Sequence, residues 1–235
     1  MTSGIGQSNA KKEERSNVIV ACRVMQPELE CIRDGNSGVD IRYIDQGLHR
    51  TPDKMAALVQ EQVDEAAPCA KRIVLGYGLC SNGIVGVVAR QQGLLVPRSH
   101  DCIALFMGSL SAYKKAFEKR PGTYYLTPGW IQEGKDPLGI VEDDYMRRFD
   151  RETSMWVMKE ELKHYTHIAL INTGLAEQRG LRERAMENAR VFKKEYEEIK
   201  GSLEYFSKII RGPYTDQFFL NINPYDAVTQ EMFFE

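Results

Sequence analysis

Short apolar runs alternate with amphipathic segments through the first part of the chain. The runs have the length and the aliphatic content typical of buried parallel strands, whereas the segments between them repeat apolar residues at helical spacing. Predicted strands cover residues 17–22, 39–44, 72–77 and 94–97. Predicted helices begin at Pro27 and Pro52, extend from about Asn82 to Gln92, and cover Cys102 to Phe106.

The second part of the chain is less regular. Residues 122–127 and 167–172 predict two further strands, and residues 153–165 predict a helix. Apolar residues from Leu181 to Ile199 recur three or four positions apart, which predicts one long helix. The apolar runs 203–210 and 218–222 then predict two final strands.

This order of elements predicts an α/β protein with an open, mainly parallel, Rossmann-like sheet and helices on both faces. The small, polar and charged residues 1–17 are expected to be a disordered tail. We expect residues 18–235 to form a single α/β domain, with two lobes that meet near residues 120–150 as the alternative arrangement.

Composition narrows the class of protein. The chain has 235 residues, 43% of them hydrophobic, and a formal net charge of -2, which disfavours disorder and nucleic-acid binding. It contains no apolar run long enough to cross a membrane, and its first residues do not resemble a secretory signal. We therefore expect a cytoplasmic protein whose five cysteines are reduced.

Three cysteines fall at equivalent places in the predicted sheet. Cys22 ends the first strand, Cys80 follows the third and Cys102 follows the fourth. Because the carboxyl ends of parallel strands share one edge, which is where such sheets bind ligands, we expect the three thiols to converge. Thiolates are ligands for zinc and for iron–sulfur clusters, so this arrangement indicates a metal site. The alternative is that each cysteine packs as a small hydrophobe.

Further polar residues accompany these thiols. His49, in the loop after the second strand, and His100 are candidate fourth ligands. His100, Glu28 and Asp101 are candidate acid–base groups, or partners that orient a ligand. Asp101 is also placed to cap the next helix. We expect Cys31 and Cys69 to be structural or incidental.

The loop around Cys80 resembles a dinucleotide fingerprint only in part. Gly76 and Gly78 match the pattern, but Ser81 replaces its third glycine. With Asn82 and Gly83 these residues are candidate cofactor-binding positions at the start of a helix, where a phosphate would bind. The alternative is that the glycines only permit a tight turn.

Two other functions remain open on the residues alone. Cys80 or Cys102 would be the catalytic nucleophile of an enzyme if His100 or His49 acted as its base. Aromatic residues concentrated in the second half, Trp156 among them, would suit a ligand face, but such residues more often belong to the core or to a subunit interface, here that of a homodimer.

Several segments, in the same order, resemble one uncharacterised family of the domain-of-unknown-function kind. They include Asp45–Pro52, the Gly76-Tyr77-Gly78-Leu79-Cys80 loop, Pro97–Ile103, which carries the P-R-x-H-D-C pattern, and Gly122–Trp130. Ala21-Cys22 with Glu28 resembles the opening element of the family. The resemblance covers about residues 18–222 and supplies no reaction.

The resemblance leads to expectations about the kind of organism and the partner proteins. Members of that family occur in methanogenic archaea and anaerobic bacteria, often beside corrinoid-dependent methyltransferases. It therefore implies an anaerobic protein whose partner is a corrinoid protein or a methyltransferase, with the corrinoid as the partner's cofactor. It leads us to expect a zinc or iron–sulfur protein acting in corrinoid-linked methyl transfer or metallocofactor assembly. The alternative is an accessory module that binds a corrinoid, a nucleotide or a partner protein without catalysis.

Overall fold

A computed structural model of the chain describes residues 16–33, 38–45, 52–175 and 180–234. The predicted disordered tail therefore lies almost wholly outside the described residues, and so does His49. Within the described ranges, no helix combines the length and the apolar character needed to span a bilayer.

The larger of two open sheets has five strands in the order β2-β1-β3-β4-β8. The strands are β1 (Asn17–Cys22), β2 (Val39–Ile44), β3 (Arg72–Gly76), β4 (Leu94–Pro97) and β8 (Phe219–Ile222). The first four run parallel and β8 pairs antiparallel with β4. Strands β1 and β3 are almost wholly buried, which is why they read as continuous apolar runs.

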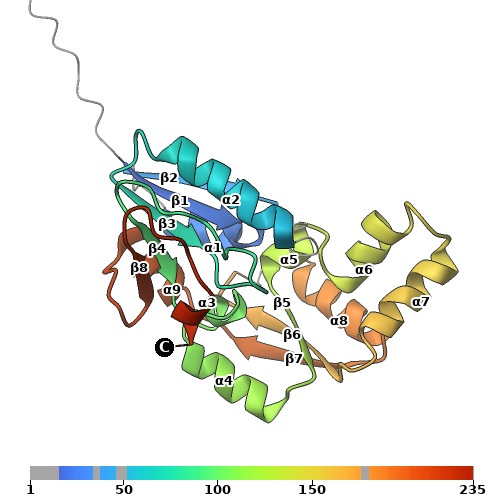
Figure 1. Cartoon of the computed structure of the whole chain (residues 1–235). Coiled ribbons are helices and arrows are strands. Elements are labelled where there is room, and N and C mark those ends of the chain that lie inside the picture. The colour runs from blue at the N-terminus through green and yellow to red at the C-terminus, as the bar shows by residue number, and fades with distance from the viewer. Residues whose placement is uncertain (1–15, 34–37, 46–51, 176–179, 235) are drawn as a thin grey trace, which may run out of the picture.

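The smaller sheet is parallel throughout, in the order β5-β6-β7. Its strands are β5 (Thr123–Leu126), β6 (His167–Asn172) and β7 (Glu195–Lys200). The chain thus enters a second sheet at Thr123 and returns to the first with β8 (Figure 1). The expected mainly parallel α/β architecture is confirmed.

Helices surround both sheets. They are α1 (Gln26–Arg33), α2 (Pro52–Ala66), α3 (Ile103–Phe106), α4 (Leu110–Lys119), α5 (Pro128–Gln132), α6 (Pro137–Ile140), α7 (Arg151–Glu161), α8 (Leu181–Val191) and α9 (Glu204–Arg211). Short 3-10 turns cover Arg23–Met25 and Glu231–Phe233, and a π-helical turn covers Val141–Tyr145. Helix α2 packs against β1 and β2, and α9 packs against α1 and β3.

Three predicted elements are wrong. Residues 82–92 form turns and isolated bridges rather than a helix, because Cys80, Ser81 and Asn82 all have a positive φ. The predicted long helix ends at Val191, and β7 follows it.

The third wrong element is the predicted strand 203–210, which is helix α9. Its buried residues lie one and four positions apart, which is the spacing of one helical face. They are Tyr205, Phe206, Ile209 and Ile210.

The carboxyl edges of the two sheets face each other across the middle of the molecule, as the arrowheads of β1 and β6 show (Figure 1). Side-chain contact joins the two edges, because the Thr173 hydroxyl after β6 donates to Glu28 Oε1 in α1 at 2.8 Å. Helix α5 reaches the same region, since a Cβ built on Gly129 would lie only 1.8 Å from the Val24 carbonyl oxygen. Only glycine permits this approach.

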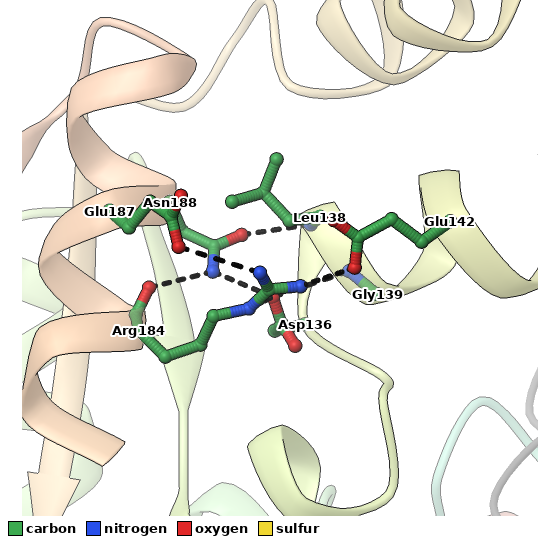
Figure 2. Close-up of polar contacts among 7 residues, drawn as sticks. All are labelled: Asp136, Leu138, Gly139, Glu142, Arg184, Glu187 and Asn188. Atoms are coloured by element: carbon green, nitrogen blue, oxygen red, sulfur yellow. Dashed lines mark hydrogen bonds and ion pairs between the residues drawn. The ribbon is translucent and has the colours of Figure 1, made fainter. Parts of the chain in front are cut away.

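A buried polar cluster fixes α6 against α8 (Figure 2). Asp136 is 1% exposed, and its Oδ2 accepts from Arg184 Nε at 3.0 Å and from Asn188 Nδ2 at 2.6 Å. The same oxygen accepts from the Gly139 backbone N–H, which caps α6. Asn188 Oδ1 in turn accepts from the Leu138 backbone N–H at 2.9 Å. Each buried polar atom of this cluster thus has a partner, as stability requires.

Candidate metal centre

Three buried cysteines lie at the carboxyl edge of the larger sheet. Cys22 is the last residue of β1, Cys80 lies in the loop after β3, and Cys102 directly precedes α3. Their exposed fractions are 1%, 5% and 4%, whereas Cys31 and Cys69 are exposed. The distribution separates the three cysteines predicted to share a site from the two predicted to be incidental.

The two loops that carry Cys80 and Cys102 lie directly against each other. The backbone N–H of Leu79 donates to the Ser99 carbonyl at 2.8 Å, and that of Cys80 donates to the His100 carbonyl at 3.0 Å. A Cβ on Gly78 would lie 2.7 Å from the Asp101 carbonyl carbon, so a side chain at this position would force the loops apart. Glycine here lets the two thiols meet.

The thiols interact with one another electrostatically. A side-chain hydrogen bond with Cys80, followed by burial and by the charge on Cys22, raises the pKa of Cys102 well above its usual value. Burial, opposed by a hydrogen bond from the Val24 backbone and aided by the charge on Cys80, raises the pKa of Cys22 to about 12. Both thiols are therefore protonated at neutral pH in the protein without bound metal.

After the other thiols, the ionisable neighbours that act on these pKa values are carboxylates. Asp45 and Glu133 raise the pKa of Cys22, and Asp101 raises that of Cys102. Reactive cysteines lie in electropositive surroundings that lower the thiol pKa. The environment of these thiols has the opposite sign, so it suits a cation better than a nucleophile.

Tyr77 is a member of this cluster that the sequence reasoning missed. It is 1% exposed, and burial, followed by the charges on all three cysteines, raises the pKa of its hydroxyl well above the usual value. That hydroxyl has no hydrogen-bond partner among the described residues, although a buried hydroxyl normally has one. Its position between Gly76 and Gly78, at a strand end, was the available signal.

The backbone at Cys80 is constrained. Cys80, Ser81 and Asn82 have φ values of 48°, 57° and 65°. These values lie in the left-handed region, which residues other than glycine rarely adopt. Such conformations cost about 1–3 kcal/mol each and cluster at functional sites. The surrounding fold therefore stabilises an unfavourable turn that places Cys80.

The three thiols do not form a finished coordination site. Across the part of the chain that the structure describes, no three His, Cys, Asp or Glu side chains are arranged to hold a metal ion as they stand. Since sulfurs that share one zinc ion lie within about 4 Å of one another, metal binding would require rotation of cysteine side chains.

His100 and Asp101 face a different space. The His100 ring packs on Phe234 with ring centroids 4.7 Å apart, and both His100 and Asp101 line a groove of about 600 Å³ beside α4. Asp101 Oδ1 accepts from the backbone N–H of Ile103 at 2.8 Å, which confirms the predicted helix cap. The backbone of this segment contacts the Cys80 loop, whereas the His100 ring points to Phe234.

Within the described part of the chain, the Glu28 side chain forms its hydrogen bond with Thr173, which follows strand β6 of the smaller sheet, and not with a thiol. Its side chain is fully buried, Thr173 donates to its Oε1, and its Oε2 has no partner among the described residues. Burial raises its pKa to about 7. A carboxyl group with a pKa near neutrality is suited to proton transfer.

The predicted cofactor-binding loop is packed rather than open. A Cβ on Gly76 would lie 2.6 Å from the Ala21 Cβ, and one on Gly83 would lie 1.7 Å from the Met55 methyl group. These glycines permit close packing. The helix expected to follow Ser81 and Asn82 is not formed, so the loop lacks the helix N-terminus on which that prediction relied.

Fold and site together define an α/β protein of two open sheets with a buried cluster of three thiols at one carboxyl edge. Residues 43–210 match the model of a family described as "Protein of unknown function (DUF1638)", and the chain belongs to this family. The matched range contains Cys80 and Cys102, whereas Cys22 and Glu28 precede it. Among curated proteins nothing matches, and no solved structure matches either.

Proposed function

We propose that Cys22, Cys80 and Cys102 bind a thiophilic metal centre, either one zinc ion or an iron–sulfur cluster. The observation that carries the proposal is the burial of three thiols from three strand ends among acidic neighbours. Thiolates are soft ligands that suit both kinds of centre. Metal binding would replace the thiol protons and offset the charge of Asp45 and Asp101.

Tyr77 supports the same proposal. Its buried hydroxyl has no partner among the described residues, and it lies within the electrostatic reach of all three sulfurs. A bound centre, or a water molecule or ligand on that centre, would provide the missing partner. A site made only to pack cysteines as hydrophobes would gain nothing from a buried hydroxyl.

Metal content after anaerobic purification tests the proposal. We expect about one zinc ion, or the iron of one cluster, per chain, and we expect Cys22→Ser, Cys80→Ser and Cys102→Ser each to lower it severalfold. Cys31→Ser and Cys69→Ser are matched controls, because both residues are exposed, and they should leave the metal content unchanged.

The result that would refute the proposal is less than about a tenth of an atom of zinc or iron per chain in wild-type protein whose circular dichroism shows a folded chain. Equal loss in the buried and exposed cysteine variants would refute it as well. Absorbance separates the two centres, since an iron–sulfur cluster is brown and a zinc protein is colourless.

The finer role that we propose is corrinoid-linked methyl transfer or metallocofactor assembly in the cytoplasm of an anaerobe. A corrinoid protein or a methyltransferase would be the partner. Bound zinc with an open position would supply activation of a substrate thiol, whereas a cluster would supply electron transfer. His49, which lies outside the described residues, or His100 would act as the fourth ligand or in proton transfer. His100 would have to turn its ring away from Phe234 to do so.

The alternative, an accessory binding module without catalysis, is favoured by the groove beside His100. Its volume of about 600 Å³ lies within the range of small-ligand sites, and Tyr113 and Phe117 contribute aromatic surface to it. Purified protein that contains no metal but carries a corrinoid or nucleotide absorbance would favour this alternative.

A further inference from the structure

A cavity of about 510 Å³ lies at the carboxyl edge of the smaller sheet. Its lining residues are Asn172, Thr173, Gly174, Glu198, Lys200 and Gly201. They come from the ends of β6 and β7 and from the residues that follow, which is where open parallel sheets bind ligands. The volume is that of a small-molecule site rather than of a single ion.

Among the residues that the structure describes, the charges at this cavity leave one cation uncompensated. Arg182 donates to both oxygens of Glu198, at 2.8 and 3.0 Å, and Asn172 Nδ2 donates to Oε1 at 2.7 Å. These bonds lower the pKa of Glu198 to about 2, so its carboxylate is ionised and neutralised by Arg182. Lys200 forms no hydrogen bond or ion pair with any residue that the structure describes. The cavity is therefore suited to an anion.

A buried carboxyl group lies directly behind one wall of this cavity. Thr173 lines the cavity, and its hydroxyl donates to the buried Glu28 carboxyl, whose Oε2 has no partner among the described residues. A buried oxygen of this kind is normally satisfied by a ligand or a water molecule. The cavity thus presents the Thr173 hydroxyl, which the buried Glu28 carboxyl orients from behind, in addition to the Lys200 ammonium.

Glycine shapes the rim of the cavity. A Cβ on Gly201 would lie 2.9 Å from the Phe106 carbonyl oxygen and 2.9 Å from the Thr173 Cγ2 atom, so the end of β7 approaches α3 without a side chain between them. Helix α3 begins directly after Cys102. The cavity and the thiol cluster are therefore built on the same central segments of the fold.

We infer that this cavity binds a small oxyanionic molecule, a carboxylate or a phosphate ester. Lys200 would pair with the anionic group, and the Thr173 hydroxyl oxygen, whose proton is donated to Glu28, would accept from a hydroxyl or amino group of the same molecule. The inference goes beyond the proposed metal centre and does not depend on it, since none of the lining residues is a cysteine.

Calorimetric titration of the purified full chain with succinate and with inorganic phosphate, in buffers of equal ionic strength, tests the inference. We expect saturable binding of at least one probe, and the tighter of the two identifies the source of the oxyanion. Lys200→Gln should weaken that binding about tenfold or more, because it removes a charge-assisted hydrogen bond. Lys200→Arg should retain most of it.

Lys159→Gln is the matched control, because Lys159 is an exposed lysine on α7 away from the cavity. It should leave the affinity unchanged. The inference is overturned if neither probe binds saturably, if Lys200→Gln binds like the wild type, or if Lys159→Gln weakens binding equally. Metal content plays no part in these outcomes, so the inference can fail or hold independently of the metal proposal.

Discussion

Replacement of Asp136 by alanine tests how the α6–α8 region is stabilised. The substitution removes a buried carboxylate that accepts from Arg184, from Asn188 and from the Gly139 backbone N–H that it caps (Figure 2). Removing one partner of a buried ion pair costs about 3–5 kcal/mol, and loss of a helix cap alone costs about 1 kcal/mol. These costs overlap, because one oxygen makes all three contacts.

The low end of this range applies here. The Arg184 side chain is 24% exposed. After the substitution it still forms an ion pair with Glu142, whose Oε2 lies 2.9 Å from Arg184 Nη2. Asn188 Nδ2 also keeps one acceptor, the Arg184 carbonyl at 2.9 Å. We therefore expect Asp136→Ala to lower the free energy of unfolding by about 3 kcal/mol and the melting temperature by about 6–12 °C.

Urea unfolding followed by far-UV circular dichroism measures this change. Glu142→Ala is a matched control, because it removes another carboxylate that pairs with Arg184. The Glu142 side chain is 52% exposed, whereas Asp136 is buried. An exposed ion pair contributes less than about 1 kcal/mol, so the control should be nearly neutral. If Asp136→Ala and Glu142→Ala lower stability equally, burial does not determine the strength of this cluster and the reasoning is wrong.

The remaining predictions concern Glu28 and the thiols. Burial raises the pKa of Glu28 from 4.5 to about 7, so its contribution to stability is complete below pH 4.5 and falls by about 3 kcal/mol as the pH rises through 7. Glu28→Gln should therefore be more stable than wild type at pH 8 in thermal unfolding, and a less stable variant would contradict this cause. In metal-free native protein, Cys31 and Cys69 should react rapidly with a thiol reagent and the other three cysteines only on unfolding. More than two fast thiols would show that the cluster is accessible.

Most strands could be predicted because burial determines their composition. Residues 18–22 and 168–171 are continuous apolar runs, and the strands that contain them, 17–22 and 167–172, have the predicted bounds. Helix α9 was mistaken for a strand because Tyr205, Phe206, Ile209 and Ile210 stand as adjacent pairs, which a short apolar run cannot distinguish from a buried strand. A correct assignment depended on tertiary packing against α1 and β3.

The candidate site could be predicted only as far as one sheet edge. Strand ends placed Cys22, Cys80 and Cys102 together, because parallel strands share a carboxyl edge whatever their separation along the chain. Asp45 and Glu133 could not be found in the same way. Glu133 directly follows α5, and its influence on Cys22 depends on how the second sheet docks against the first. No pattern in the sequence encodes that docking.

The sign of the electrostatics at the thiols distinguishes the two kinds of cysteine chemistry that the sequence left open. A nucleophile needs a thiolate at neutral pH, and therefore a nearby cation or helix N-terminus that lowers the thiol pKa. Here a hydrogen bond with Cys80 and burial raise the pKa of Cys102, burial raises that of Cys22 to about 12, and the expected helix after Cys80 is not formed. A bound metal ion reverses this balance, because it favours the thiolates and is itself favoured by the acids around them. The features that make Cys22 and Cys102 poor nucleophiles are thus the features that a metal centre would use.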